Sequence, residues 1–146
     1  MNYKNLLIFL STLTYCLSNA AISQKVIAPK SFSGLKNYKE LRTMADYQAI
    51  MNSPKPQILK LDTGSCGACK TMEPVFNDIA GEKSMLADFS TVNVDNEPFK
   101  SLIEKHSLES VPTTLYLRSG KEVKRDIGSM TKSDFGNQIR SFVKSN

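Results

Sequence analysis

Hydrophobic spacing divides the chain after about residue 39 into short elements. Apolar residues in short or alternating runs predict strands, and apolar residues three and four apart predict helices. In order, the pattern predicts a strand over 40–44, a helix over 45–52, a strand from 56 to 61, a helix from 66, a strand over 89–94, a helix over 98–106, strands over 113–118 and 122–127, and a helix after Thr131. This order predicts an α/β fold, with helices on both faces of a central mixed β-sheet.

The N-terminus has the pattern of a secretory signal peptide. Lys4 precedes a short apolar stretch, and the small residues Ser18 and Ala20 suit the positions before a signal peptidase site. We expect cleavage after Ala20, which also removes Cys16. Two alternatives stay open. One is an uncleaved membrane anchor, although the stretch is shorter than the roughly 20 apolar residues that span a bilayer. The other is lipidation of Cys16.

These patterns predict a signal peptide over 1–20, a flexible polar linker over 21–38, and one domain over 39–146 that is long enough to bury a core. Three cysteines among 146 residues are too few for a scaffold held by several disulfides. The net charge of +5 is spread along the chain without a basic stripe interleaved with aromatic residues. We therefore expect no nucleic-acid binding.

Cys66 and Cys69 are the candidate chemical groups. Two cysteines three apart at the beginning of a helix can form and open a disulfide without refolding the chain. Cys66 is the expected nucleophile, because the helix N-terminus favours a thiolate, and Cys69, one turn inside, is the expected resolving residue. A zinc site would need two ligands besides Cys66 and Cys69. After cleavage His106 is the one further cysteine or histidine in the sequence, so we expect no metal. His106 itself is expected to cap a helix end rather than to catalyse. A purely structural disulfide is the alternative.

Two motifs occur together at the spacing of a known family. The sequence Cys-Gly-Ala-Cys-Lys at 66–70 is followed by Pro74, and Val-Pro-Thr follows at 111–113. The first resembles the active-site helix of thioredoxin, and the second resembles its cis-proline loop. The resemblance covers nearly all of 39–146 and implies the thioredoxin fold, a redox-active Cys66–Cys69 disulfide and no bound cofactor. It also implies a cis bond before Pro112 and a substrate surface made by Val111, Pro112, Gly67 and Ala68.

Three positions depart from that family. Ser65 stands where a tryptophan usually precedes the first cysteine, and Ala68 replaces the usual proline between the cysteines. Lys60 stands where the family has a buried acid that assists proton transfer at the second cysteine. Either the Lys60 amine reaches water while its stem packs in the sheet, or a partly buried Lys60 tunes the protonation of Cys69. Asp62, which has the same strand parity as Lys60, is a candidate to replace the missing acid.

The resemblance and the N-terminus together predict an exported thiol-disulfide oxidoreductase, periplasmic or secreted after cleavage, that reduces disulfide-containing proteins. The chain between Val94 and Pro112 leaves no room for the inserted domain of periplasmic disulfide oxidases. Residues 21–38 are too short for the dimerisation domain of isomerases, so we expect a monomer. A reductase in an oxidising compartment implies a membrane electron donor. The alternatives are a disulfide donor, and a non-enzymatic module that holds extended peptides at Val111 beside a locked disulfide.

Overall fold

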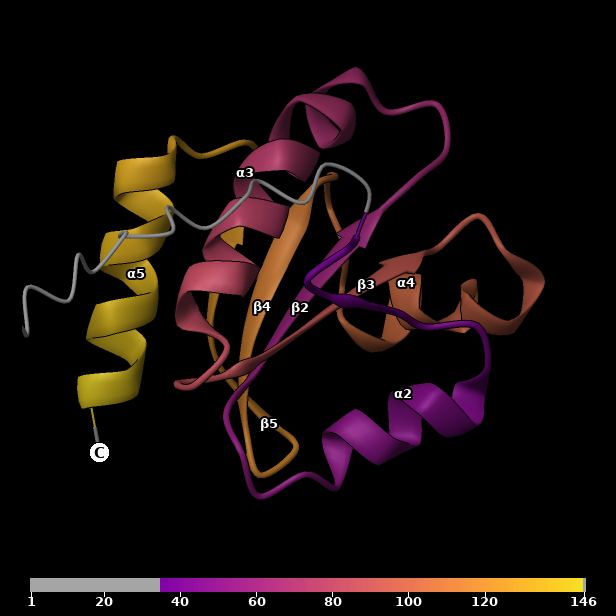
Figure 1. The fold of residues 1–146 in the computed structure, drawn as a ribbon. Coiled ribbons are helices and arrows are strands. Elements are labelled where there is room, and N and C mark those ends of the chain that lie inside the picture. Colours follow the sequence, from indigo (N-terminus) through magenta and orange to yellow (C-terminus); the bar gives the residue numbers. More distant parts are fainter. Residues whose placement is uncertain (1–34, 146) are drawn as a thin grey trace, which may run out of the picture. The chain divides into compact units, whose positions relative to one another are not determined.

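A mixed five-stranded β-sheet organises residues 35–145, the part of the chain that the computed structural model describes (Figure 1). The strand order is β1-β3-β2-β4-β5. The strands are β1 (Lys39–Glu40), β2 (Gln57–Asp62), β3 (Asp88–Asn93), β4 (Thr113–Arg118) and β5 (Lys121–Ile127). The first three are parallel, and β4 runs antiparallel to both of its neighbours. The predicted signal peptide and most of the predicted linker lie outside the described residues.

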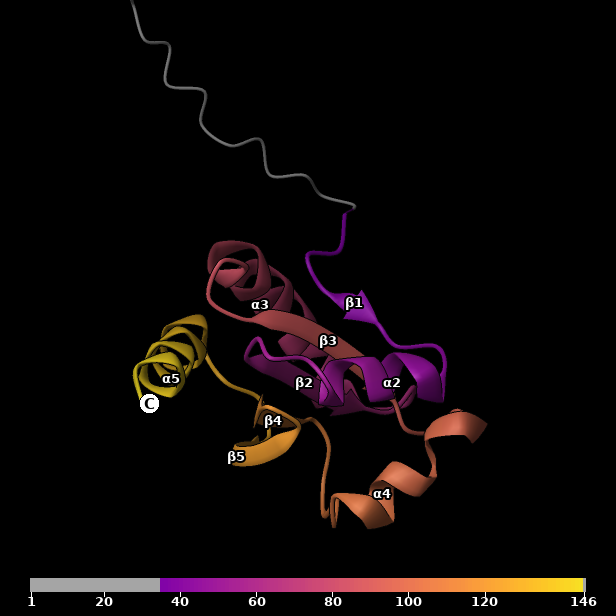
Figure 2. The same cartoon turned by 90° about the horizontal axis from the view of Figure 1, so that it is seen from below.

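Helices cover both faces of this sheet, as the order of elements predicted (Figures 1 and 2). They are α2 (Met44–Met51), α3 (Gly67–Lys83), the 3-10 turn η2 (Glu97–Phe99), α4 (Ser101–Lys105) and α5 (Lys132–Lys144). The helices α3 and α5 pack on one face, and α2 and α4 pack on the other. Within residues 35–145 no helix combines the length and apolar character that crossing a membrane requires.

Side chains that alternate along the strands build a separate core on each face. On β2, Ile58 packs under α3 and α5, whereas Leu59 and Leu61 pack under α2 and α4. The core on the α3 face is rich in aromatic side chains. At its centre Phe76 stacks on Phe135, with ring centroids 5.7 Å apart. Burial of these rings anchors α3 to the sheet, and α3 carries both cysteines.

Two predicted elements differ from the structure. The strand expected over 40–44 shortens to β1, because Thr43 caps α2. The Thr43 hydroxyl accepts the backbone N–H of Asp46 at 3.1 Å, and the Asp46 carboxylate accepts the N–H of Thr43 at 3.0 Å. The helix expected over 98–106 is divided into η2 and α4. Its first turn, which contains Pro98, is 3-10, and the N–H of Phe99 donates to Asn96 O at 2.8 Å.

The hairpin between β4 and β5 follows the prediction closely. Its two turn residues, Ser119 and Gly120, have φ angles of 47° and 73°, as a tight hairpin turn requires. A side chain at Gly120 would also collide with the backbone carbonyl of Met51. This turn therefore needs glycine for its conformation and for its close approach to α2.

The folded domain includes the last residues of the predicted linker. The backbone N–H of Asn37 donates to Asn77 Oδ1 at 2.8 Å. Tyr38 is buried, and its ring meets that of Phe76 edge-on at 5.4 Å. The domain thus begins before Lys39, because these residues pack against α3.

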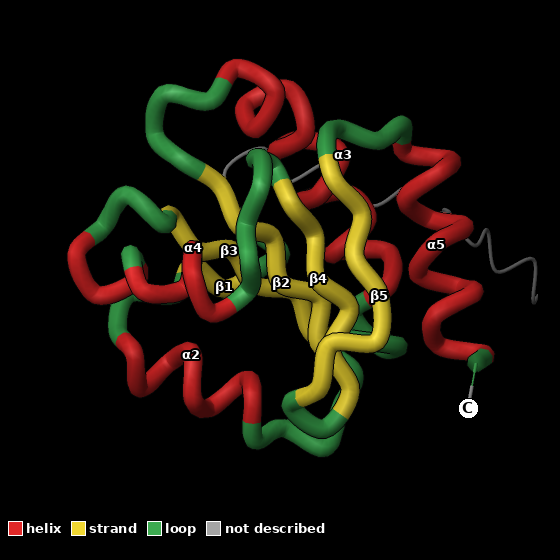
Figure 3. Tube along the Cα trace, turned by 180° about the vertical axis from the view of Figure 1, so that it is seen from behind, coloured by secondary structure: helices red, strands yellow, loops and turns green. Residues whose placement is uncertain are grey.

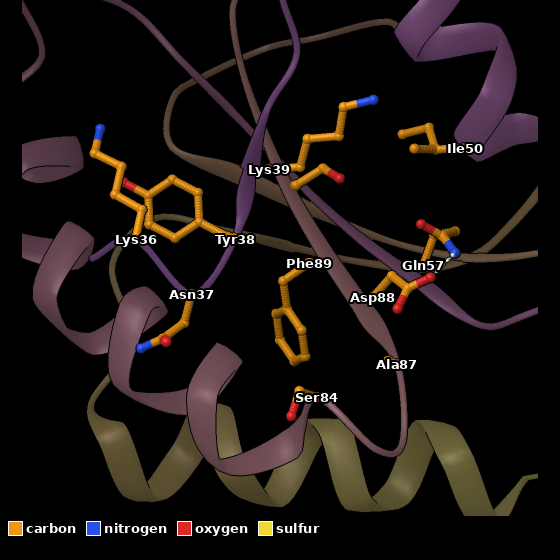
Figure 4. Close-up of a pocket in the computed structure, with 11 residues that line it drawn as sticks. Lys36, Asn37, Tyr38, Lys39, Ile50, Gln57, Ser84, Ala87, Asp88 and Phe89 are labelled. Atoms are coloured by element: carbon orange, nitrogen blue, oxygen red, sulfur yellow. Dashed lines mark hydrogen bonds between the residues drawn. The ribbon is translucent and has the colours of Figure 1, made fainter. Parts of the chain in front are cut away.

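A hollow of about 490 Å³ lies at the edge of the sheet beside β3. It exists because β1 is short and pairs only with Ser90 and Thr91, which leaves the beginning of β3 uncovered on that side. Figure 4 shows Phe89 and Tyr38 at its border, with Ile50 of α2 on the other side. Neither Cys66 nor Cys69 lines it, so this hollow is separate from the candidate chemistry.

His106 is buried where α4 ends, and it does not cap carbonyls with its side chain. Its Nε2 lies 2.9 Å from the hydroxyl of Tyr47 on α2, and its Nδ1 lies 3.7 Å from Glu122 Oε2. The backbone N–H of His106 instead donates to Leu102 O at 3.0 Å. Burial lowers the pKa of His106 below its usual value, and the nearby Glu122 carboxylate opposes this only in part.

This environment predicts that acid destabilises the domain through His106. The folded state favours the neutral ring. The contribution of His106 to the free energy of unfolding is therefore complete above about pH 6.5, the usual histidine pKa, and is lost as the pH falls through the lower pKa of the folded state. The loss is about 1.4 kcal/mol for each unit by which folding depresses that pKa. Urea unfolding between about pH 7.5 and pH 5 measures it. Because the chain has one histidine, His106→Gln should show a smaller loss. An equal loss in both proteins would contradict this prediction.

Candidate active site

Three loops meet at one end of the sheet around Cys66 and Cys69. The first joins β2 to α3, the second enters β4 and the third joins β5 to α5 (Figure 3). They meet because β4 runs antiparallel to both β2 and β5, so the beginning of β4 lies beside the ends of the other two strands. Residues far apart in the sequence therefore line a single site.

Cys66 is the N-cap residue of α3, as the pattern predicted for the beginning of the helix. Its Sγ accepts the backbone N–H of Cys69 at 3.0 Å and so satisfies one of the free donors of the first turn. The two cysteines form a disulfide with a Cα–Cα distance of 5.2 Å. Cys66 is half-buried, whereas Cys69 is only 4% exposed. Only the first sulfur is open to a large partner.

Hydrogen bonds from the residues at and just after the end of β3 hold the turn before Cys66 in place. The backbone N–H of Gly64 donates to Asp95 Oδ2 at 2.9 Å, and the N–H of Asp95 donates to Asn93 Oδ1 at 2.8 Å. Asp95 thus fixes the path by which β2 reaches the cysteines. Asp95 was not among the predicted site residues, although it directly follows the predicted third strand.

The structure brings the expected substrate-binding residues to the cysteines. The carbonyl oxygen of Val111 lies 3.7 Å from Cys66 Sγ. The peptide bond between Val111 and Pro112 is cis, and Pro112 is buried. Gly67 and Ala68 are exposed at the first turn of α3. The structure therefore places the Val111 carbonyl against Cys66 Sγ, with Gly67 and Ala68 exposed directly after Cys66.

Ser129 is a site residue that the sequence analysis missed. Its hydroxyl donates to the carbonyl oxygen of Ala68, between the two cysteines, at 3.0 Å. The preceding Gly128 has a φ of +93°, and its N–H donates to Pro112 O at 2.8 Å. In the sequence, the one signal for this turn was Gly128, between a predicted strand and the cap of a predicted helix. That signal could not identify Ala68 as the partner of Ser129.

Lys60 is buried and paired, so the interpretation in which its amine reaches water is wrong. The residue is 2% exposed, and its Nζ donates to Asp62 Oδ2 at 2.7 Å. The amine also lies 5.5 Å from the centre of the Phe76 ring. The two residues share the α3 side of β2, as their strand parity predicted, and a charged partner offsets the desolvation of the amine.

Cys69, Lys60 and Asp62 line one polar pocket of about 510 Å³. Burial raises the pKa of Asp62 above its usual value, although the hydrogen bond from Lys60 opposes this. Across the pocket, the Tyr38 hydroxyl donates to Glu73 Oε1 at 2.8 Å, and this bond lowers the pKa of Glu73. The pocket therefore offers a carboxyl group that takes up protons more readily than an exposed aspartate.

A family model described as Thioredoxin matches residues 38–141, and the matched segment includes every residue of the site. The chain belongs to the thioredoxin family. Thioredoxin 2 of Chlorobaculum tepidum is 30% identical over 102 residues, which are 69% of this chain and 92% of that protein. The thioredoxin of Mycoplasmoides gallisepticum is 24% identical over 106 residues, 73% of this chain and 99% of that one.

Solved structures agree on the thioredoxin fold. Thioredoxin from Trypanosoma brucei brucei superposes with a TM-score of 0.65 at 23% identity, covering 74% of this chain and 92% of the other. Thioredoxins are thiol-disulfide oxidoreductases that act on disulfide-containing proteins. The Cys66–Cys69 pair thus makes this member of the thioredoxin family a redox enzyme, and the predicted family is confirmed.

Proposed function

We propose that this thioredoxin-family protein reduces protein disulfides outside the cytoplasm, with Cys66 as the nucleophile and Cys69 as the resolving residue. The observation that supports these roles best is the difference between the two sulfurs. Cys66 is accessible at the N-terminus of α3, beside the Val111 carbonyl, whereas Cys69 is buried one turn later. The helix N-terminus favours the thiolate that a nucleophile needs.

The reaction proceeds in two exchanges. The Cys66 thiolate attacks one sulfur of the substrate disulfide, that S–S bond breaks, and a mixed disulfide forms while the second substrate sulfur leaves as a thiolate. Cys69 then loses its proton and attacks Cys66 Sγ. The Cys66–Cys69 disulfide forms, and the other substrate sulfur leaves and is protonated. The substrate gains two electrons and the protein loses them, which yields the disulfide form described here.

The substrate lies as an extended segment against Val111 and Pro112, with Gly67 and Ala68 on the other side of the reactive sulfur. The support for this placement is the proximity of the Val111 carbonyl to Cys66 Sγ, at 3.7 Å. An extended segment can pair with an exposed backbone edge without a fixed sequence. Ser65 stands where the family usually has a tryptophan. Substrates with bulky groups near their disulfide therefore fit better here than in family members that carry the tryptophan.

The reduction potential of the Cys66–Cys69 pair tests the direction of electron flow. Equilibration of the full chain carrying Cys16→Ser against glutathione or dithiothreitol buffers measures it, since Cys66 and Cys69 are then its only cysteines. We expect a value near or below about −250 mV, as for a reductase. A value above about −150 mV would instead identify a disulfide donor. A disulfide that mild dithiol does not open would identify a binding module.

The Lys60–Asp62 pair is proposed to take over the proton transfer that serves Cys69. Asp62 accepts the Cys69 proton through the polar pocket that both residues line, and Lys60 positions the Asp62 carboxylate. The supports are their 2.7 Å contact and the raised pKa of Asp62. A buried cation alone would stabilise a Cys69 thiolate but could not accept its proton.

Lys60→Met tests this proposal. The Asp62 carboxylate then loses its cation, so its pKa rises further and the pH dependence of turnover moves to higher pH. The domain also loses about 3 kcal/mol of unfolding free energy, because one charge of a buried pair is left alone. The Lys60→Met/Asp62→Asn double variant should lose less than the two single variants summed. Unchanged turnover and pH profile in Lys60→Met would contradict a role in proton transfer.

Export is proposed from the N-terminal pattern of Lys4, the apolar stretch and the Ser18–Ala20 site. The mature protein is a periplasmic or secreted monomer that begins at Ala21. Its electrons come from a membrane protein, because soluble NADPH-driven reductases are cytosolic. N-terminal sequencing of the protein isolated from its own cells should begin at Ala21. Recovery of uncleaved protein that begins at Met1 from the soluble cytosolic fraction would contradict export.

A further inference from the structure

We propose that Ser129 is a positioning residue that holds the Cys66–Cys69 turn in place while its disulfide is open. This inference rests on the two-step reaction proposed above. Ser129 lies 61 residues beyond Ala68 in the sequence, yet its hydroxyl donates to the Ala68 carbonyl oxygen at 3.0 Å. The reactive turn is thereby attached to the loop between β5 and α5.

Two other hydrogen bonds of the turn lie within the first turn of α3 and its N-cap. The N–H of Lys70 donates to Cys66 O at 3.3 Å, and the hydroxyl of Thr71 donates to Gly67 O at 3.2 Å. Both keep the first turn helical but do not connect it to the rest of the domain. The bond from Ser129 differs, because it ties the residue before Cys69 to the loop between β5 and α5.

Ser129 is itself held to the substrate-binding loop. The N–H of the preceding Gly128 donates to Pro112 O at 2.8 Å, and the carbonyl of the neighbouring Val111 faces Cys66 Sγ. The Gly128–Ser129 segment therefore bonds to both sides of the site. The edge that meets the substrate and the turn that carries the sulfurs are kept in one fixed arrangement.

This arrangement matters most when the protein disulfide is broken. In the oxidised form the S–S bond itself holds Cys66 to Cys69. In the mixed disulfide Cys66 is bonded to the substrate, and non-covalent contacts alone keep Cys69 aimed at Cys66 Sγ. Ser129 supplies one of those contacts at the residue next to Cys69, so its loss slows the second exchange more than the first.

The test separates the two exchanges by rapid acid quench and mass spectrometry, with a peptide that contains one internal disulfide as the probe. All proteins are full chains that carry Cys16→Ser and are reduced beforehand. In a Cys69→Ser background only the first exchange occurs, and the rise of the mixed disulfide gives its rate. With Cys69 present, the decay of the mixed disulfide gives the rate of the second exchange.

Ser129→Ala should slow the decay about three- to fivefold, the effect of losing one hydrogen bond of modest net strength, and leave the first exchange unchanged. Ser129→Thr and Ser129→Val form a matched pair of nearly equal shape. The threonine variant should behave like the natural protein, and the valine variant like Ser129→Ala. Because Ser129 is exposed, all three variants should fold, and the alanine and valine variants should unfold at an only slightly lower urea concentration than the natural protein.

The other outcomes overturn the inference. Equal decay rates in the serine and alanine proteins would show that the bond does not position Cys69. Slowing of both exchanges by the same factor would show that Ser129 acts in substrate docking. Equal behaviour of the threonine and valine variants would show that the shape of the side chain matters and its hydroxyl does not. If the Cys69→Ser protein forms no mixed disulfide at all, the proposed function itself fails, which is a result distinct from all of these.

Discussion

Cys66 at the N-cap of α3 is the placement on which the rest of the site depends. Its sulfur replaces the usual capping oxygen and accepts the N–H of Cys69. The same donors that would bond a capping side chain thus stabilise a reactive thiolate. This works only if α3 is rigid, and burial of Phe76 among aromatic rings fixes the helix on the sheet. The hydrophobic core therefore sets the geometry of the reactive sulfur.

The Lys60–Asp62 pair adds a second constraint, because an ammonium group beneath an active-site helix must have a partner. A buried charge without one would cost several kcal/mol, so the two residues form a unit. The pair also makes the surroundings of Cys69 polar, in contrast to the aromatic core further along α3. One face of the sheet thus combines an apolar region that stabilises the helix with a polar region that lies beside Cys69.

Sheet topology assembles the site from distant segments. The register that places Leu61 beside Thr113, and Thr113 beside Ile127, brings the ends of three strands together. The loops at those ends then meet through the bonds of Gly128 and Ser129 to Pro112 and Ala68. Neither the cysteine turn nor the proline loop has these contacts by itself, so the surroundings of Cys66 are a property of the three loops together.

Local sequence patterns were enough to predict the features that depend on neighbouring residues: most strands and helices, the hairpin turn at Ser119 and Gly120, and two cysteines opening a helix. These follow from local periodicity and from backbone preferences. Packing in three dimensions sets the pairing of the Lys60 amine with Asp62, the approach of Val111 to Cys66 and the bond from Ser129 to Ala68. Such contacts depend on strand register, rotamers and the packing of loops, and a linear pattern of polar and apolar residues does not encode distances across the fold.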